Sequence, residues 1–275
     1  MTDTYAVMGN PIGHSKSPSI HAHFAEQLGE RLTYDAILVE LDGFQEAVRT
    51  FRARGGLGLS VTVPFKESAC ALARRLRPRA ATAGAANTLW FDNGDGVVAD
   101  NTDGLGLTTD LVRAFGTEIR GARILMLGAG GAARGALGAL LDQEPDSLVI
   151  ANRTVAKAES LAGLIDGHPE VLGRGFDDLE GFEFDIVINA TSASLSGDVP
   201  PIAPRIMTGN VWVYDMMYGP TPTAFLAWAE RNGARRLADG LGMLVEQAAE
   251  AFFLWRGARP ETLPVLRRLR DEISR

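Results

Sequence analysis

The chain has 275 residues, of which 46% are hydrophobic and 22% charged, so it can form two domains with substantial cores. Its formal net charge of −7 argues against a general attraction to nucleic acid or to an anionic membrane surface. The single cysteine, Cys70, excludes an internal disulfide framework and is typical of a reducing compartment. The first residues lack the basic region and apolar stretch of a secretory signal, so we expect a cytoplasmic protein.

Short apolar strands alternate with helical stretches through the first part of the chain, which predicts parallel βαβ units. Asp92-Asn93-Gly94-Asp95-Gly96 is a good turn between two apolar runs and predicts a hairpin, which makes this sheet mixed. We expect strands at residues 5–8, 32–39, 59–63, 86–91 and 97–100, and helices at 18–28, at 43–54 and beginning near residue 66.

A connecting helix over residues 101–115 leads into a second set of alternating elements. The helix expected at 241–255 is strongly apolar and has no partner strand, so it should pack back on the first half. We therefore divide the chain into residues 1–103 with 240–275, and residues 104–239. The strands expected in the second part lie at 124–127, 148–151, 171–174, 185–189, 211–215 and near Arg236.

The apolar run 123–127 is followed by Gly128-Ala129-Gly130-Gly131-Ala132-Ala133. A strand, a glycine-rich turn and a helix start are the arrangement that holds a dinucleotide pyrophosphate on backbone N–H groups. Such a turn alone is a weak signal, and its structural alternative is an ordinary βα turn. Because strands flank it on both sides, we predict an α/β fold in which 104–239 form a doubly wound Rossmann domain and the discontinuous remainder a substrate domain with a mainly parallel mixed sheet.

Asn152-Arg153-Thr154 follows the second strand of this set, where an NAD-binding fold places an acidic residue on the ribose. An arginine there favours a ribose that carries a 2′-phosphate. Arg153 and Lys157 both lie near a helix start, where the helix dipole disfavours cations unless an anion arrives. The sequence therefore predicts NADP(H) as cofactor; the alternative is a solvated basic helix start.

Polar side chains also follow the strands of the first half. Ser15 and Ser17 lie two residues apart, so in an extended segment their hydroxyls point the same way and can bind a carboxylate. Taken alone, a serine before Pro18 is more often a helix cap.

Further candidates are Thr62 and Lys66 at the end of one strand, because ligands of open α/β sheets collect at strand carboxyl ends. Asn87 lies in the first strand of the hairpin, and Asp103 follows its second strand. Beside Lys66, Asp103 would form a proton-handling pair; the alternatives are a surface lysine and a helix cap. The histidines have no acidic cluster beside them, so we expect no metal.

Together these segments resemble the shikimate dehydrogenase family over most of the chain. The matching motifs are Gly9-Asn10-Pro11, Ser15-Lys16-Ser17-Pro18, Val61-Thr62-Val63-Pro64-Phe65-Lys66, Ala86-Asn87-Thr88, Asp100-Asn101-Thr102-Asp103-Gly104, Gly128-Ala129-Gly130-Gly131-Ala132, Asn152-Arg153-Thr154, Asn189-Ala190-Thr191-Ser192, Asp215-Met216-Met217-Tyr218 and Asp239-Gly240-Leu241-Gly242-Met243-Leu244-Val245-Glu246-Gln247-Ala248-Ala249.

The resemblance implies reversible NADPH-dependent reduction of 3-dehydroshikimate to shikimate in aromatic amino acid (chorismate) biosynthesis, by a monomer or homodimer. It implies that Lys66 is the acid/base residue and Asp103 its partner. By carry-over, Ser15, Ser17 and Tyr218 hold the substrate carboxylate, Thr62, Lys66, Asn87, Asp103 and Gln247 surround the ring hydroxyls and the carbonyl, Met216 and Gly240 approach the nicotinamide, and the rest of the cofactor contacts Gly128, Ala129, Gly130, Gly131, Ala132, Asn152, Arg153, Thr154 and Lys157.

Three positions depart from the family pattern: Ser60 stands for an asparagine, Ser194 for a common glycine and Lys157 for a frequent arginine. Two other functions remain open. A quinate/shikimate dehydrogenase of the same fold would oxidise a saturated ring acid and could use NAD, although Arg153 argues against NAD. A non-catalytic metabolite sensor would be favoured by loss of Lys66 or Asp103, and both are present.

Overall fold

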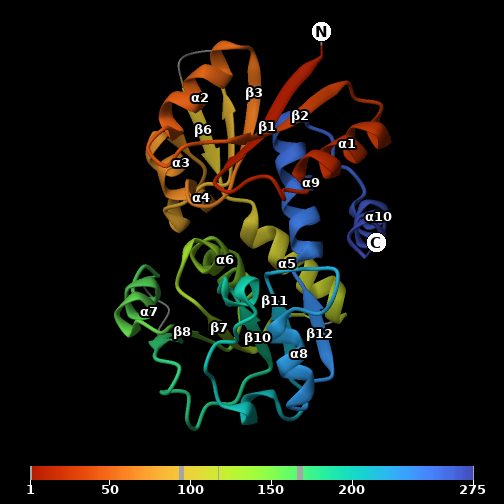
Figure 1. Cartoon of the computed structure of the whole chain (residues 1–275). Coiled ribbons are helices and arrows are strands. Elements are labelled where there is room, and N and C mark those ends of the chain that lie inside the picture. Colours follow the sequence, from red (N-terminus) through yellow and green to blue (C-terminus); the bar gives the residue numbers. More distant parts are fainter. Residues whose placement is uncertain (1, 93–95, 117, 166–169, 275) are drawn as a thin grey trace. The chain divides into compact units, whose positions relative to one another are not determined.

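The structure, a computed structural model, describes residues 2–92, 96–116, 118–165 and 170–274. The chain forms two compact units, residues 1–106 with 244–269 and residues 107–243 with 270–275 (Figure 1). No helix among the described residues combines the length and apolar character needed to cross a bilayer.

The described residues of the first unit form a six-stranded mixed sheet in the order β2-β1-β3-β5-β6-β4. Strand β5 runs antiparallel to both its neighbours, β3 and β6, while β1 pairs in parallel with β2 and β3. The predicted hairpin strands are present, and turn residues 93–95 lie outside the described residues. The elements are β1 (Asp3–Gly9), α1 (Ser17–Leu28), β2 (Leu32–Leu38), α2 (Phe44–Ala53), β3 (Gly56–Val61), α3 (Lys66–Leu72), β4 (Arg75–Leu76), α4 (Pro78–Ala83), β5 (Thr88–Phe91) and β6 (Val97–Asp100).

Side chains of β1 alternate between the two faces of this sheet, as a strand requires. Ala6 and Met8 join the core under α2, α3 and α4. Tyr5 and Val7 face the other side, where Trp255 of α9 (Leu241–Arg256) packs against them. The Trp255 Nε1–H donates to the carbonyl of Leu89 at 3.0 Å, so α9 is tied to this sheet.

The second unit contains a parallel sheet in the order β12-β11-β10-β7-β8-β9. This is the doubly wound dinucleotide-binding order, so the predicted fold class is confirmed. The elements of this part of the chain are α5 (Asp103–Phe115), β7 (Arg123–Leu127), α6 (Gly131–Leu141), β8 (Ser147–Ala151), α7 (Val155–Ala162), β9 (Val171–Arg174), β10 (Ile186–Asn189), η1 (Ala193–Ser196), η2 (Pro204–Met207), β11 (Trp212–Asp215), α8 (Ala224–Arg231) and β12 (Arg236–Asp239).

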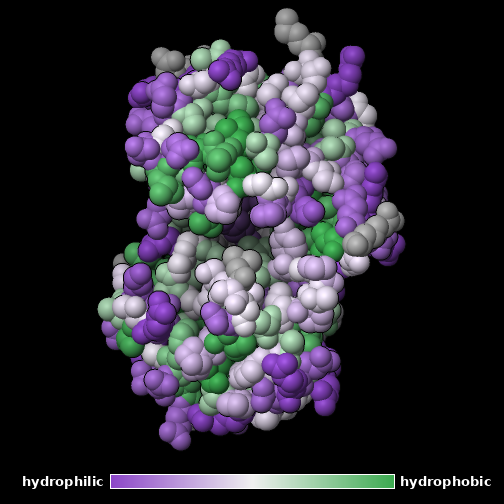
Figure 2. Space-filling view, in the orientation of Figure 1, coloured by the Kyte–Doolittle hydropathy of each residue, from purple (hydrophilic) through white to green (hydrophobic). Residues whose placement is uncertain are grey.

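The strands of this sheet divide their side chains between two cores. Ile124 and Met126 of β7 pack with residues of α5, α6 and α7, whereas Leu125 and Leu127 pack with residues of α8 and η2. Burial on both faces explains why these strands are continuously apolar. Figure 2 shows that hydrophilic residues cover much of the visible surface of each unit, with apolar residues in smaller areas between them.

Several boundaries differ from those expected. Strand β3 begins at Gly56, because pairing with β1 starts there, and β5 begins at Thr88, one residue after Asn87. The elements that were not predicted include the two-residue strand β4, the helices α4 and α8, the short helices η1 and η2, and helix α10 (Thr262–Ile273). Helix α10 is rich in charge and buries only Val265 and Leu269.

Candidate functional site

Five candidate substrate residues of the first unit follow β1, β3 or β6, which run in the same direction: Ser15, Ser17, Thr62, Lys66 and Asp103. The loop after β1 and the loop after β3 are joined by backbone hydrogen bonds from Thr62 to Met8 (2.9 Å) and from Asn10 to Val63 (2.9 Å). Gly9 permits this approach, because a Cβ there would lie 2.4 Å from the Thr62 side chain. The sequence thus brings Thr62 beside the loop that carries Ser15 and Ser17.

Lys66 and Asp103 form an ion pair with 2.5 Å between Nζ and Oδ2. Lys66 is the first residue of α3 and Asp103 the first residue of α5. The Lys66 side chain is 19% exposed and that of Asp103 8%, so the pair is mostly shielded yet reachable. Neutralisation by the carboxylate explains how a cation can occupy the start of α3.

Asn87 connects this pair to α9. Its Nδ2 donates to Oδ1 of Asp103 (2.8 Å), to Oγ1 of Thr102 (2.9 Å) and to Oε1 of Gln247 (3.1 Å). Its Oδ1 accepts from the backbone N–H of Thr102 (2.9 Å) and the hydroxyl of Thr88 (2.9 Å). Asn87 is buried, so this network fixes Asp103 and Gln247 relative to one another.

The prediction that Ser15 and Ser17 lie in an extended segment is wrong. Lys16, between them, has helical φ and ψ of −88° and −4°, and α1 begins at Ser17. The Ser15 hydroxyl accepts instead from the backbone N–H of Ser17 at 3.3 Å. This local turn, rather than strand alternation, holds the Ser15 hydroxyl at the start of α1.

Two hydrogen-bonded side chains near the candidate substrate residues, Thr102 and Tyr34, were given no function from the sequence. Thr102 belongs to the Asn87 network, and the Tyr34 hydroxyl donates to Ser60 at 2.7 Å. Both depend on residues far apart in the chain, so neither left a local motif with an evident function.

In the second unit, the glycine turn lies between β7 and α6. Gly128 has φ of +104°, which favours glycine, and a Cβ there would meet the Ala190 backbone at 3.2 Å. A Cβ at Gly130 or Gly131 would meet nothing within 4 Å, so the backbone there is open to a ligand. Ala129 and Ala132 are partly buried against the core, and Ala133 is fully buried in it.

The start of α6 carries no side-chain cap and no acidic residue in its first turn. Its first N–H groups therefore suit the pyrophosphate of a dinucleotide. The geometry of the turn fits the predicted cofactor.

Arg153 and Lys157 are exposed at the start of α7. Among the described residues, no acidic side chain forms an ion pair with either of them, and the first turn of α7 contains no acidic residue. Asn152 Nδ2 donates to the carbonyl of Thr154 at 2.9 Å and shapes the turn before the helix. This region can accept an anionic group, as a 2′-phosphate requires.

Met216 and Gly240 lie side by side at the carboxyl ends of β11 and β12. A Cβ at Gly240 would lie 2.1 Å from the Met216 carbonyl oxygen, so only glycine permits this contact. The buried Asp215 carboxylate accepts from the N–H of Met217 at 3.0 Å and holds the turn. Tyr218 follows in the same unit, where burial raises the pKa of its hydroxyl.

The Asp215 carboxylate also accepts from Ser194 (2.7 Å), Thr223 (2.6 Å) and Asn189 (3.0 Å). Burial raises the pKa of Asp215, and these hydrogen bonds oppose that rise. Ser194, one of the three departures from the family pattern, is thus a hydrogen-bond donor to a buried carboxylate.

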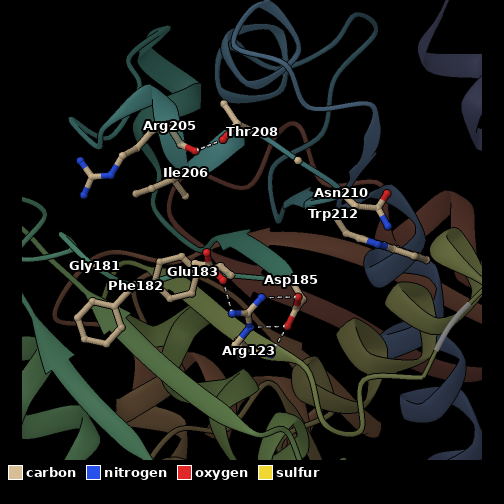
Figure 3. Close-up of a pocket in the computed structure, with 12 residues that line it drawn as sticks. Arg123, Gly181, Phe182, Glu183, Asp185, Arg205, Ile206, Thr208, Asn210 and Trp212 are labelled. Atoms are coloured by element: carbon tan, nitrogen blue, oxygen red, sulfur yellow. Dashed lines mark hydrogen bonds and ion pairs between the residues drawn. The ribbon is translucent and has the colours of Figure 1, made fainter.

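A pocket of about 650 Å³ lies elsewhere in the second unit, at the amino ends of its strands (Figure 3). Arg123 opens β7 there and is paired with Asp185 (3.0 Å) and Glu183 (2.8 Å). Because ligands of doubly wound sheets bind at strand carboxyl ends, we do not assign this pocket to the dinucleotide. No cluster of three or more potential metal-ligating side chains occurs within the described part of the chain.

Three stretches of the sequence match known families. Residues 7–89 match the shikimate dehydrogenase substrate binding domain, residues 110–196 shikimate/quinate 5-dehydrogenase, and residues 240–270 the shikimate 5′-dehydrogenase C-terminal domain. Together they cover both units.

Similarity to individual proteins extends over the full chain. Shikimate dehydrogenase (NADP(+)) of Nitrosospira multiformis is 56% identical over 274 residues, covering 100% of this chain and 99% of that protein. An Ael1 enzyme from Pseudomonas putida is 49% identical with a TM-score of 0.92, over 98% of each chain. Shikimate 5-dehydrogenase from Thermus thermophilus, solved with NADP(H) and shikimate, is 30% identical with a TM-score of 0.84, over 97% of this chain and 99% of that one. The chain therefore belongs to the shikimate dehydrogenase family.

Proposed function

We propose that the chain reversibly reduces 3-dehydroshikimate to shikimate with NADPH, with Lys66 and Asp103 at the reacting carbonyl. The activity follows from full-length similarity to shikimate dehydrogenases (NADP(+)). The single observation that supports the residue roles is the 2.5 Å ion pair between Lys66 and Asp103, joined to Asn87 and Gln247 at strand carboxyl ends. The enzyme would serve aromatic amino acid biosynthesis. We place it in the cytoplasm, because a chain with a single cysteine and no internal disulfide is typical of a reducing compartment.

Lys66 supplies the proton in this proposal. NADPH, when bound, provides the hydride that adds to the carbonyl carbon. Negative charge then develops on the carbonyl oxygen, and the Lys66 ammonium donates a proton to it, leaving a neutral amine that takes a proton back from solvent. Asp103 holds the ammonium in place, and Asn87 fixes the other carboxylate oxygen of Asp103. A positioned proton donor accelerates such a step by roughly 10²–10⁴-fold.

The remaining substrate residues divide by the group they would bind. Hydroxyl donors suit the ring carboxylate, whereas amide and hydroxyl groups that both donate and accept suit ring hydroxyls. We assign Ser15, Ser17 and Tyr218 to the carboxylate, and Thr62, Asn87 and Gln247 to the ring hydroxyls and the carbonyl.

The second unit would hold the cofactor. The open backbone at the glycine turn suits the pyrophosphate, and the cations at the start of α7 suit the 2′-phosphate. Met216 and Gly240 would approach the nicotinamide. We assign the cofactor to Gly128, Ala129, Gly130, Gly131, Ala132, Asn152, Arg153, Thr154, Lys157, Met216 and Gly240.

The proposal is tested with purified protein, one of two acids (shikimate or quinate) and one of two cofactors (NADP⁺ or NAD⁺). The absorbance of the reduced cofactor, NADPH or NADH, measures the rate of each combination. We expect shikimate with NADP⁺ to give the highest kcat/KM. A preference for quinate with NAD⁺ would replace the proposal with the quinate alternative, and a chain inactive in every combination would support a sensor. We expect a monomer or homodimer, which light scattering measures.

A further inference from the structure

The Tyr34 hydroxyl lies between two buried serines on different elements. Tyr34 is on β2, and its hydroxyl donates to Ser60 of β3 at 2.7 Å. The side chain of Ser17, at the start of α1, lies near enough to the Tyr34 hydroxyl to lower its pKa against the effect of burial. Strand β1 lies between β2 and β3 in the sheet, so the phenol spans β1 to reach Ser60.

Aromatic packing fixes the Tyr34 ring. His21 stacks on it with ring centroids 4.1 Å apart and planes 5° apart, and Trp255 lies 6.3 Å away. Tyr34 is buried, and burial raises the pKa of its hydroxyl above the ordinary value. The stacked imidazole thus supports the Tyr34 ring in the position from which its hydroxyl bonds Ser60.

Ser17 and Ser60 are both buried, so each hydroxyl needs a protein partner. In the present arrangement Tyr34 donates its only proton to Ser60, and its lone pairs can accept from Ser17. A ligand carboxylate would accept the hydrogen bond of the Ser17 hydroxyl in place of Tyr34, because a charged acceptor makes the stronger hydrogen bond. The Tyr34 proton can then turn to Ser17, and Ser60 can donate to Tyr34, so that all three hydroxyls stay bonded before and after binding.

We propose that Tyr34 is a positioning residue for the substrate carboxylate, which it serves by orienting the hydroxyls of Ser17 and Ser60. The inference rests on the proposed function, in which Ser15 and Ser17 bind that carboxylate. Ser60 occupies the position where the family pattern has asparagine, so this arrangement of three hydroxyls belongs to this chain's own sequence. Ser60 also pairs across the sheet with Thr88, whose hydroxyl bonds Asn87, so the trio adjoins the Asn87 network.

The test compares Tyr34→Phe with Tyr5→Phe. Tyr5 is a matched control: it lies directly opposite Tyr34 in the β1–β2 register, its ring stacks on Trp255 at 4.9 Å, and its hydroxyl accepts from Arg256 rather than from a serine. Loss of one uncharged hydrogen bond should raise the KM for shikimate about 3- to 10-fold in Tyr34→Phe. We expect kcat and the KM for NADP⁺ to stay near wild type, and Tyr5→Phe to leave all three values unchanged.

A second substrate separates positioning from a general packing effect. With the neutral methyl ester of shikimate, the KM ratio of Tyr34→Phe to wild type should fall toward one, because the charged acceptor for Ser17 is absent. Adding Tyr34→Phe to Ser17→Ala should raise the KM for shikimate no further. If Tyr34→Phe does not fold, Ser60→Ala removes the same hydrogen bond from its other end and should raise the KM similarly.

An unchanged KM for shikimate in these variants, or an equal rise in Tyr5→Phe, would overturn the inference and leave the proposed function intact. A ratio that persists with the ester would assign Tyr34 to packing. A wild-type chain inactive on shikimate would overturn both proposals.

Discussion

The polar network of the first unit and the glycine turn of the second unit differ in whether their polar groups already have protein partners. Around Asn87, side chains bond one another, and the Lys66 ammonium already has its carboxylate partner. At the glycine turn and the start of α7, backbone N–H groups are uncapped and the cations have no acidic partner among the described residues. A proton donor must be held in one geometry before substrate arrives, whereas a phosphate site receives its counter-charge from the ligand. The first region should therefore respond steeply to one lost side chain, and the second in proportion to the charge removed.

Lys66→Ala is the most severe test of the side-chain network around Asn87 and Lys66. We expect kcat to fall by roughly 10²–10⁴-fold, because the proton donor is lost, with a modest change in the KM for shikimate. Steady-state kinetics in both directions measure this. Arg268→Ala is the control, since it removes an exposed cation, paired with Glu26 at 3.5 Å, from the same unit. Near-normal turnover in Lys66→Ala would contradict the assigned role.

Arg153→Ala tests the cationic site at the start of α7. Loss of one charge-assisted contact, about 1.5–3 kcal/mol, should weaken NADPH binding roughly 10- to 100-fold while NADH binding changes little. Fluorescence titration of both cofactors measures the two Kd values. Arg231→Ala removes an exposed arginine at the end of α8 and should leave both unchanged. An equal loss for NADH and NADPH would show that Arg153 does not contact the 2′-phosphate.

The same contrast explains what could be predicted from the sequence. The glycine turn, β7 and the start of α6 are contiguous, so one local pattern identified them, and the strand-end rule placed Lys66 and Asp103 at one edge of a sheet. The network around Asn87 was not predictable from spacing, because Asn87 and Gln247 are 160 residues apart. The Ser15–Ser17 geometry was predicted wrongly, because the period of two holds only in strands and Lys16 is helical.

His21 also lies in the first unit but, unlike Asn87, is not fully hydrogen-bonded within the part of the chain that the structure describes. Its Nε2 is buried without a hydrogen-bond partner among the described residues, and burial lowers its pKa from 6.5 to about 3. Above pH 6.5 the imidazole is neutral in both the folded and the unfolded state. As the pH falls from 6.5 toward 3, only the unfolded state takes up the proton, so the free energy of unfolding falls. Between pH 7 and 5 this group alone should lower the free energy of unfolding by about 2 kcal/mol.

His21→Phe should abolish that loss while keeping a ring stacked on Tyr34. Urea unfolding at pH 7 and pH 5 measures the difference. His23→Phe, two residues along α1 and only partly buried, is the control and should keep the wild-type pH dependence. Equal slopes in His21→Phe and wild type would show that His21 takes up no proton on unfolding.

Ser194→Ala should give the smallest effect. It tests whether the second unit also contains a network of side chains that bond one another, here around Asp215. Ser194 donates to the buried Asp215 carboxylate at 2.7 Å, and loss of a hydrogen bond to a charged group costs about 1.5 kcal/mol of unfolding free energy at pH 7. Because burial raises the folded-state pKa of Asp215, the carboxyl takes up a proton as the pH falls through that value, and the cost of losing the donor should shrink. Ser196→Ala, in the same short helix, removes an exposed hydroxyl and is the control. A loss in Ser194→Ala that stays constant between pH 7 and acid pH would mean that Ser194 stabilises the turn by packing rather than through the charge of Asp215.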